Sequence, residues 1–215
     1  HWHPNPDFFF KPGAGPMLDV GPYYVTNLIQ LLGPVKRVGA LTSSAFAERT
    51  ITSEPRAGEK IPVETPTNIH ALLEFKEGAN ITLSTSRDVH VHRHGHMELY
   101  GTEGSLFLPD PNFFGGNVEL GAPGGEISAL DSWDHPFGVP NQDTRANYRV
   151  AGLADMAAAV AEGRNHRCSL DLAIHAIDVM TSVLKSGDSG AFIDLSTSCD
   201  RPAPLGPGDA RALLA

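Results

Sequence analysis

The chain has 215 residues, of which 41% are hydrophobic and 19% charged, as in an ordinary globular protein with one substantial core. Its net charge of −9 argues against nucleic acid or an anionic membrane as a partner, and no apolar run approaches the roughly 20 residues of a membrane-spanning helix. Cys168 and Cys199 fit no metal or redox motif, and so few cysteines favour a reducing, cytoplasmic location.

The first third of the chain predicts a loop, a helix and a strand. Residues 1–16 are rich in proline and aromatic residues, which is typical of a loop. Apolar residues then recur at helical spacing over about 17–32, and Gly33, followed by proline, ends that helix. A strand is expected over 35–43, and a polar excursion with several prolines over 45–66.

The middle of the chain predicts strands that are close together in sequence. Apolar and polar residues alternate in several short segments separated by glycine-containing turns. These segments predict two hairpins and two further short strands: 68–75 with 80–86, 97–100 with 105–108, 118–120 and 126–127.

The last third predicts two helices and a closing strand. A helix over 149–163 is expected to turn five apolar residues inward: Val150, Leu153, Ala157, Val160 and Ala161. A stronger helix over 170–185 has Ser169 as its cap and Gly187 just after its end. A strand over 191–195 follows, and the remaining tail is expected to pack along the surface.

Antiparallel hairpins bracketed by helices predict an α+β fold. We expect a mixed, mainly antiparallel open sheet with helices on one face, formed by residues 1–215 as a single domain. Because helices cover one face only, the other face of the sheet needs either water or a protein partner.

The glycine-rich entry to the first helix is the most informative local feature. Gly13 and Gly15 allow a sharp turn and a close approach, and Asp19 suits the start of a helix. Tyr23 lies four residues after Asp19, on the same side of a helix. These features also fit plain structure, with Asp19 as a capping residue and Tyr23 at the edge of the core.

Four histidines occupy every second position from His90 to His96. On an extended strand they would point the same way, as in a Zn²⁺ or Ni²⁺ chelate or a pH-responsive patch. They also fit a polar strand near a binding cleft. We expect no physiological metal here, and we expect His92 to contact a substrate.

Residues 19–23 resemble the D-x-G-x-H helix of the Gfo/Idh/MocA oxidoreductases, with tyrosine where many relatives carry histidine. The resemblance extends to residues 2–6 and 8–10, to the hairpin 99–106, and to the long helix within 169–190. These segments cover most of the chain in the order expected for that family.

The resemblance implies a second domain that this sequence does not contain. Members of the family carry a Rossmann domain that binds NAD or NADP and has a Glu-Lys-Pro motif. Here no glycine-rich nucleotide fingerprint follows a strand, and Glu59-Lys60 is followed by Ile61. We therefore expect the C-terminal portion of a longer, two-domain dehydrogenase, paired as a homodimer or higher through the open sheet face.

The resemblance also implies roles for individual residues. Tyr23 stands at the position of the family histidine and is the expected catalytic acid or base; its phenol, with an ordinary pKa of about 10, would need a nearby positive charge. Asp19 would hold a substrate hydroxyl or orient Tyr23. Gly15 would approach the cofactor. Thr26 stands where many relatives have a further acidic residue.

Four more residues are expected to contact substrate. Trp2, His3 and Asn5 precede the motif and would line a sugar cleft, or else pin the loop by packing. His175 lies on the helix that relatives place beside the cleft, although a core histidine with satisfied hydrogen bonds is the alternative.

The intact protein is thus expected to be an NAD(P)-dependent oxidoreductase that acts on a sugar or a similar polyol. The 215 residues alone would supply dimerisation and substrate recognition without catalysis. The alternative is a non-catalytic sugar-binding or assembly module on the same scaffold.

Overall fold

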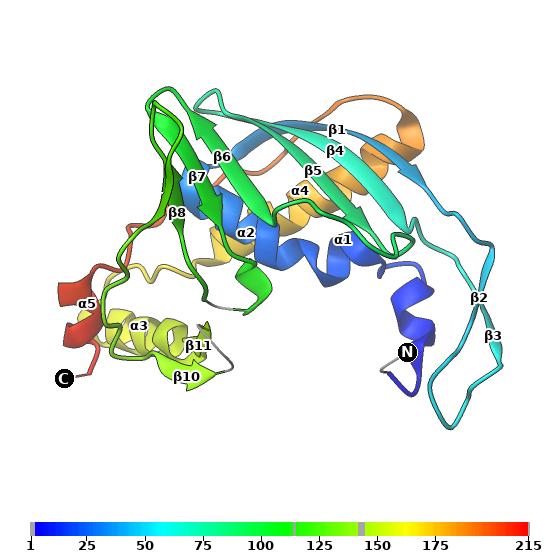
Figure 1. Ribbon diagram of the computed structural model, residues 1–215, viewed down its shortest axis with the longest axis horizontal. Helices are drawn as coiled ribbons and strands as arrows, with labels where there is room; N and C mark the ends of the chain where they lie inside the picture. The colour runs from blue at the N-terminus through cyan, green and yellow to red at the C-terminus, as the bar shows by residue number, and fades with distance from the viewer. Residues whose placement is uncertain (1–2, 114, 142–144, 215) are drawn as a thin grey trace. The chain divides into compact units, whose positions relative to one another are not determined.

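The computed structural model describes residues 3–113, 115–141 and 145–214 (Figure 1). The chain forms two compact units, the first from residues 1–91 and 170–201, the second from residues 92–169 and 202–215. Each unit is built from two separate stretches of the chain. The expectation of a single domain stays a prediction. The two units are described separately.

A four-stranded antiparallel sheet forms the centre of the first unit. Its order is β12 (Ile193–Asp194), β1 (Val35–Ser43), β4 (Asn68–Phe75) and β5 (Asn80–Ser86). The strand predicted over 35–43 and the hairpin that follows it are therefore confirmed. Alternate residues of β4 point into the core, where Ile69, Leu73 and Phe75 are almost fully buried.

Three helices cover one face of this sheet: α1 (Pro16–Asp19), α2 (Gly21–Leu32) and α4 (Leu170–Ser189) (Figure 1). Each helix turns an apolar stripe toward the sheet. The buried side chains of these stripes include Met17, Val25, Leu28, Ile29, Leu172, Val179 and Val183. Because the helices take one face only, the opposite face of the sheet is left open.

The single helix predicted over 17–32 is wrong in one respect, because it is divided at Val20. In an uninterrupted helix Pro22 would have to donate to the carbonyl of Leu18. Proline has no N–H, and its ring collides with that carbonyl. The chain bends at this point, and the Tyr23 N–H donates to the Val20 carbonyl, 3.2 Å away.

The predicted end of the last long helix is also wrong, because α4 continues through Gly187 to Ser189. Gly187 faces β1 so closely that an added Cβ would lie 2.3 Å from Cγ2 of Thr42. This glycine is a packing residue rather than a stop. The helix ends at Gly190, which adopts a left-handed φ of +67° that favours glycine.

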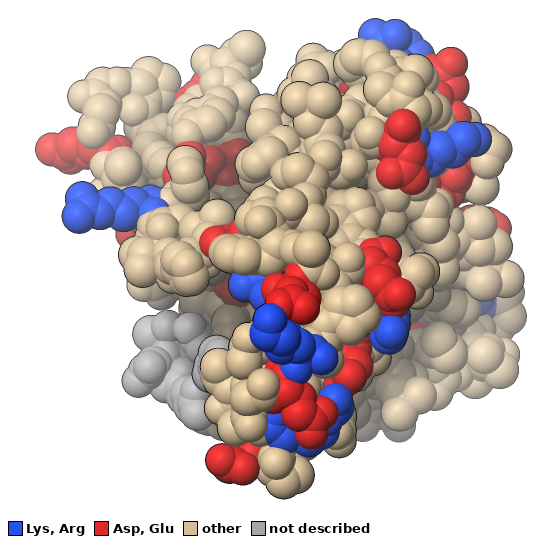
Figure 2. Space-filling view, turned by 90° about the vertical axis from the view of Figure 1, so that its right-hand side faces the viewer, with Lys and Arg blue, Asp and Glu red and all other residues tan. Residues whose placement is uncertain are grey.

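The excursion over 45–66 forms a hairpin of its own, from β2 (Glu48–Thr50) and β3 (Lys60–Pro62). A short 3₁₀ helix, η1 (Pro6–Phe10), is joined to its loop by the Arg56–Asp7 ion pair. Basic and acidic side chains lie next to one another on the face that carries these segments (Figure 2). Exposed pairs such as Lys60–Glu48 contribute little to stability.

The second unit contains a sheet in which each strand pairs with the next: β6 (Met97–Gly101), β7 (Gly104–Leu108), β8 (Glu119–Gly121) and β9 (Ile127–Ala129). This arrangement confirms the predicted hairpin and short strands. The remaining elements of the unit are η2 (Pro111–Phe113), β10 (Val139–Asn141), β11 (Arg145–Asn147), α3 (Arg149–Glu162) and α5 (Pro207–Ala212).

The face of α3 that was predicted to be inward is exposed. Val150, Leu153 and Val160 lie at the surface, whereas the buried positions are Ala151, Asp155 and Ala159, which follow one another at intervals of four. The reason is Asp155, whose carboxylate accepts hydrogen bonds from arginines beyond the helix. These bonds hold the polar residue inside and turn the apolar stripe outward.

The α+β class is confirmed, with every described strand pair antiparallel and the strands divided between separate sheets rather than joined in one. The tail, which was expected only to pack along the surface, contains the short helix α5. No helix in the described part of the chain is both long and apolar enough to cross a membrane.

Candidate functional site

The glycine-rich turn before α1 is shaped by packing. Gly15 has a φ of +85°, and an added Cβ would lie 3.1 Å from both the Thr65 side chain and the Pro66 carbonyl oxygen. The Gly15 N–H donates to the Phe9 carbonyl, 3.1 Å away. Backbone geometry and these neighbours in the first unit require a glycine here, and the approach of Gly15 to a cofactor stays a prediction.

Asp19, at the end of α1, pairs with Arg87, which directly follows β5. Arg87 Nη2 donates to Asp19 Oδ2, and the guanidinium carbon lies 4.6 Å from the centroid of the Phe9 ring. The Asp19 side chain remains 41% exposed. Arg87 Nε is buried and has no hydrogen-bond partner among the described residues. The pair is therefore open to solvent on the Asp19 side and incompletely bonded on the Arg87 side.

The backbone of Arg87 is fixed by its own set of bonds. Its N–H donates to the Thr67 carbonyl at 2.9 Å, and its carbonyl accepts from Arg49 Nη2 at 3.1 Å. Arg49 in turn lies with its guanidinium carbon 4.5 Å from the centroid of the Phe46 ring. Arg87 is therefore held at a fixed position between α1 and the end of the sheet.

The carboxylate of Asp88 holds Arg49 and the neighbouring strands in place. Its buried carboxylate is paired with Arg49 and accepts from Thr67 Oγ1 at 2.6 Å, Asn68 Nδ2 at 2.7 Å and the Ala45 N–H at 3.2 Å. A carboxylate with several donors is well compensated for its burial. Asp88, the residue after Arg87, thus ties β4, the end of β5 and the segment before β2 together.

Tyr23 lies half-buried in the first turn of α2. Its hydroxyl has no hydrogen-bond partner within the part of the chain that the structure describes. Asp19 bonds to Arg87 rather than to Tyr23. The two residues predicted to share a helix face therefore lie on consecutive helices, separated by the break at Val20.

His3 and Asn5 are engaged in holding the N-terminal loop. The His3 ring packs edge-on against Phe8 and Phe9, with centroid separations of 5.1 and 5.6 Å, and His3 Nδ1 accepts from the Asn5 N–H at 3.0 Å. Asn5 Oδ1 also accepts from Arg56, 3.4 Å away. These contacts favour the pinning role over the cleft role. Trp2 lies outside the described residues.

His175 is a core histidine, so we leave it out of the proposed site. Its side chain is fully buried; Nε2 accepts from the Val35 N–H at 2.9 Å, and Nδ1 lies 2.9 Å from Thr197 Oγ1. Because Nε2 accepts, the neutral ring carries its proton on Nδ1. Burial lowers the pKa of His175, an effect that the nearby Asp178 opposes. Neither ring nitrogen is left for a substrate.

The segment with four histidines is irregular rather than a strand. His92 and His94 stack with their ring centroids 6.4 Å apart. Among the described residues, no group of three or more His, Cys, Asp or Glu side chains could hold a metal ion. His92 belongs to the second unit and Asp19 to the first, so the contact of His92 with a substrate stays a prediction.

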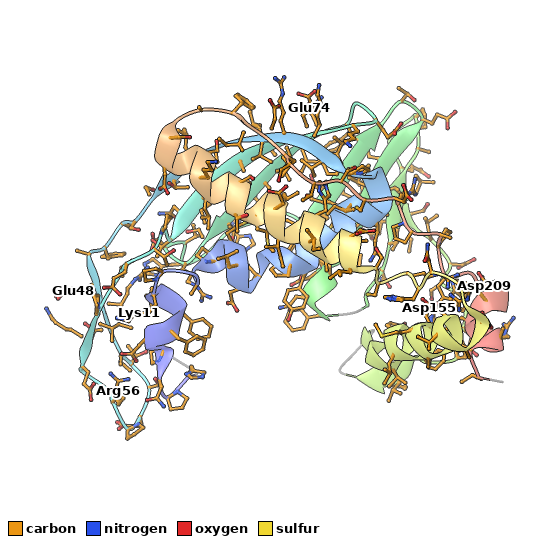
Figure 3. The ribbon with its side chains drawn as sticks, turned by 180° about the vertical axis from the view of Figure 1, so that it is seen from behind. Lys11, Glu48, Arg56, Glu74, Asp155 and Asp209 are labelled. Carbon is orange, nitrogen blue, oxygen red and sulfur yellow. The ribbon has the colours of Figure 1, made fainter. Side chains whose placement is uncertain are left out.

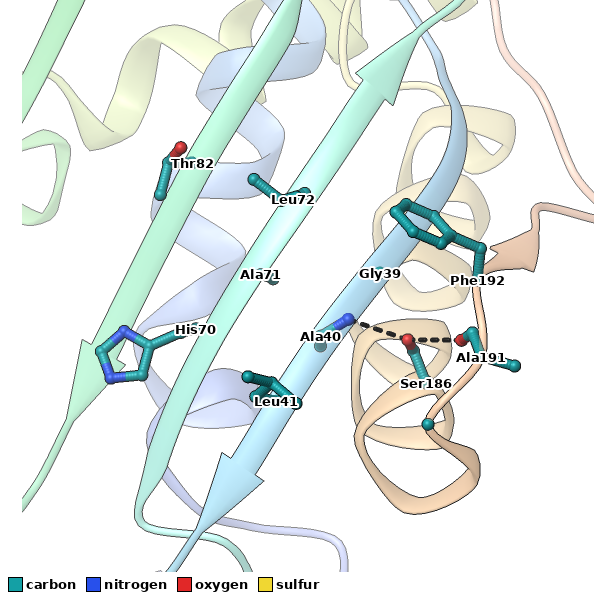
Figure 4. Close-up of a pocket in the computed structure, with 11 residues that line it drawn as sticks. Gly39, Ala40, Leu41, His70, Ala71, Leu72, Thr82, Ser186, Ala191 and Phe192 are labelled. Atoms are coloured by element: carbon teal, nitrogen blue, oxygen red, sulfur yellow. Dashed lines mark hydrogen bonds between the residues drawn. The ribbon is translucent and has the colours of Figure 1, made fainter.

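The open face of the sheet in the first unit carries a cavity of about 380 Å³ (Figure 4). Leu41, Leu72 and Phe192 contribute apolar surface to it and are 76, 54 and 59% exposed. Ser186 Oγ accepts from the Ala40 N–H and donates to the carbonyl of Ala191, which holds the segment before Phe192 against β1. Charged groups, including Glu74, also lie on this side of the sheet (Figure 3).

Sequence reasoning missed Arg87 and its supports. Asp88 lies just before the histidine segment and Arg49 within the polar excursion over 45–66, where neither forms part of a motif. A lone arginine after a strand carries no periodic signal. The one available hint was the presence of Arg87 and Asp88 at the end of a well-predicted hairpin.

The fold is shared with solved oxidoreductase structures. The complex of levoglucosan dehydrogenase with NADH and levoglucosan matches with a TM-score of 0.68 and 19% identity, over 91% of this chain and 56% of that chain. A NAD binding oxidoreductase from Klebsiella pneumoniae gives a TM-score of 0.66 at 17% identity (86% and 52%). Aldose-aldose oxidoreductase from Caulobacter crescentus, complexed with glycerol, gives 0.61 at 20% identity (90% and 52%).

This chain therefore has the fold of a domain found in these oxidoreductases and spans slightly more than half of their length. Residues 1–107 match the model of the GFO/IDH/MocA C-terminal domain. The chain belongs to the GFO/IDH/MocA family, which confirms the resemblance in its sequence. No curated protein sequence matches the chain.

The residues of this chain do not fit a dinucleotide on their own. Dinucleotide-binding folds use parallel strands joined by helices, with a glycine-rich turn that contacts the pyrophosphate. All described strand pairs here are antiparallel, and Gly15 packs against Thr65 and Pro66.

Proposed function

We propose that this chain is the substrate-binding and dimerisation portion of an NAD(P)-dependent oxidoreductase that acts on a sugar or a similar polyol. The observation that carries the proposal is the Asp19–Arg87 pair, in which Asp19 is exposed at the end of α1 and the Arg87 backbone is bonded to Thr67 and Arg49. Tyr23, four residues after Asp19, has a hydroxyl without a hydrogen-bond partner among the described residues. NAD or NADP, bound by a separate nucleotide-binding domain, would supply or accept the hydride.

Within this chain, each residue of the site has a distinct role. Asp19 accepts a hydrogen bond from a substrate hydroxyl, which a carboxylate does well. Tyr23 moves the proton of the reacting hydroxyl, and its phenol needs a positive charge nearby to work near neutral pH. His3 and Asn5 keep the N-terminal loop in place beside α1.

The open face of the sheet is the proposed dimer interface. A second copy of this chain suits it, because exposed Leu41, Leu72 and Phe192 form an apolar centre beside the charged Arg37–Glu74 pair. Sedimentation equilibrium at micromolar concentration should give a dimer for the wild-type chain and a monomer for Leu72→Arg. A monomeric wild-type chain would refute this interface.

The catalytic part of the proposal is tested by Tyr23→Phe in the intact two-domain enzyme. We expect kcat to fall by about 10²–10⁴-fold, the usual contribution of a general acid or base, with KM nearly unchanged. The matched control is Tyr24→Phe, at the next position of the same helix. A Tyr23→Phe enzyme with full turnover would remove Tyr23 from the mechanism.

The second candidate function is a non-catalytic sugar-binding or assembly module. It is favoured by the antiparallel pairing of the described strands, which offers no dinucleotide site within this chain. Sequencing the native polypeptide separates the two candidates: a preceding nucleotide-binding domain supports the oxidoreductase. We also propose a cytoplasmic location, because both Cys168 and Cys199 are free thiols.

A further inference from the structure

A histidine, His70, lies on the open face of the sheet in the first unit and lines its cavity (Figure 4). It belongs to β4 and stands directly opposite Leu41 of β1, while Leu72 follows two residues later on the same face. All three residues are exposed. A titratable imidazole is therefore placed among the apolar side chains of the proposed dimer interface.

The surroundings of His70 suit a neutral ring better than a charged one. Its Nδ1 lies 2.9 Å from Ser84 Oγ, and among the residues that the structure describes no carboxylate pairs with the ring. The neighbouring strand β5, residues 80–86, consists of uncharged residues. Asp88, which follows β5, is buried and paired with Arg49. One serine hydroxyl can satisfy one nitrogen of the ring, whereas protonation adds a second N–H donor and a charge.

The other charged groups of this sheet face lie away from His70. Glu74 is four residues further along β4, about 13 Å in an extended strand, and is paired with Lys36 and Arg37 of β1. Asp194 of β12 lies opposite Arg37 in the strand register. A positive charge on His70 would therefore find no opposite charge on the strands beside it.

Pairing two open faces takes His70 out of water. A symmetric dimer uses the same patch on both copies, so each dimer covers two such rings. Burying a neutral ring that keeps a hydrogen bond costs little, but burying an unpaired charge costs much more. Protonation of His70 thus opposes pairing, and pairing opposes protonation.

The overall charge of the chain predicts the opposite response to acid. The net charge is −9 when the histidines are neutral, and protonation of its 10 histidines moves it toward zero. A smaller net charge reduces the repulsion between two copies and favours association. A dimer that weakens on acidification therefore indicates a titrating group inside the interface.

We propose that His70 is a pH switch in the dimer interface: two open sheet faces pair while both rings are neutral and separate when the rings are protonated. This inference rests on the proposed function, since it concerns the regulation of the same interface. Histidine is the side chain that ordinarily changes its charge between pH 5 and 8, which sets the range in which the switch works.

The test is sedimentation equilibrium of the wild-type chain at pH 7.5 and 5.5, with circular dichroism to confirm the fold at both. A histidine that must lose its proton weakens pairing about tenfold over this range, so two in each dimer weaken it up to about a hundredfold. We expect the dissociation constant of the dimer to rise about tenfold or more. Equal dissociation constants at the two pH values overturn this inference alone. A wild-type chain that is monomeric at pH 7.5 overturns the proposed interface with it.

Three variants and one control assign the effect to His70. His70→Gln and His70→Leu stay uncharged and should form dimers of equal stability at the two pH values. His70→Lys keeps a positive charge and should pair about tenfold or more weakly than the wild type at pH 7.5. His90→Gln removes an exposed histidine outside the strands of the same unit and should respond to pH like the wild type.

The uncharged variants also decide against the proposal if it is wrong. If they weaken on acidification as much as the wild type, another group is the switch. If neither forms a dimer at pH 7.5, a neutral side chain at this position is not sufficient for pairing, which contradicts the mechanism.

Discussion

Two arginine–carboxylate clusters in this chain contain the same kinds of charged group but differ in burial and in the number of hydrogen bonds to the carboxylate. In the second unit, the side chain of Asp155 is 4% exposed, and its oxygens accept from Arg164 Nη1 at 3.1 Å, Arg167 Nη1 at 2.6 Å and the Arg167 N–H at 2.8 Å. In the first unit, the Asp19 side chain is 41% exposed and, among the described residues, its carboxylate bonds to Arg87 alone. A saturated carboxylate stabilises the fold, whereas an unsaturated one is available to a ligand.

The position of each cluster explains this difference. Asp155 lies on the buried side of α3, and Arg167 also reaches Asp209 of α5, which ties the tail to the helix (Figure 3). Asp19 is the last residue of α1, just before the break at Val20. Bond saturation and exposure together thus distinguish the structural ion pair of Asp155 from the pair that we propose for ligand binding.

The largest expected effect is on stability, from Asp155→Ala. The substitution leaves two partly exposed arginines without their shared partner, and losing the charge-assisted hydrogen bonds to a buried carboxylate costs about 2–3 kcal/mol. Chemical denaturation should show this loss. A loss below about 1 kcal/mol would contradict the structural role of the cluster.

Asp155 should also make the stability depend on acid pH. Burial alone would raise its pKa, but hydrogen bonds from Arg167 and Arg164 outweigh this effect and hold the pKa below the ordinary value of 3.8. A lowered pKa contributes stability above the unfolded value, and that contribution is lost as the pH falls through the folded value. Asp155→Asn should remove this part of the acid dependence.

A smaller stability effect is expected for Asp88→Asn, which breaks the support behind Arg87. The amide keeps one acceptor but turns N–H groups toward the donors of Thr67 and Asn68, so we expect a loss of about 1–3 kcal/mol. Sugar affinity should fall as well, because Arg49 no longer fixes Arg87. If the fully folded variant binds sugar as tightly as the wild type, Arg87 needs no such support.

We also expect the stability to depend on pH through His175, which is a base rather than an acid. Because burial lowers its pKa, the folded protein keeps this histidine neutral while the unfolded chain binds a proton below about 6.5. Its contribution is present in full above that value and is lost as the pH falls toward the lower, folded pKa. Melting temperatures of the wild type and His175→Gln between pH 7.5 and 5 check this: the slope should be smaller in the variant.

The smallest stability effect belongs to Asp19→Asn. An exposed ion pair contributes about 0–1 kcal/mol, so its melting temperature should stay near that of the wild type. A large destabilisation would place Asp19 with Asp155, as a structural residue, and would erase the distinction between the two clusters.

Local patterns in the sequence predict the strands well, because alternation along β4 and β5 and the turn between them are adjacent in the chain. They predict helix faces less well when a polar residue is buried. Nothing in the spacing of α3 shows that Asp155 lies inside, since its partners come from the loop and tail beyond the helix. Pro22 can be recognised in the sequence as a helix breaker. Because apolar residues continue at helical spacing on both sides of it, the sequence does not reveal that the helix is divided.

The residues of the candidate site also differ in whether a local pattern in the sequence predicts them. Asp19 and Tyr23 follow from a short motif on neighbouring helices. Arg87 and Arg49 reach the site through a hairpin and a loop far along the chain, so their roles emerge only when the sheet brings them together. His175 shows the converse, because a motif position that looks functional is fully occupied within the core.

The most direct test of the central claim is calorimetric titration of the wild-type chain and Asp19→Asn with one neutral sugar at equal folded concentration. The account predicts measurable binding to the wild type and at least tenfold weaker binding to Asp19→Asn, with the melting temperature unchanged. Equal affinities of the two proteins would contradict it.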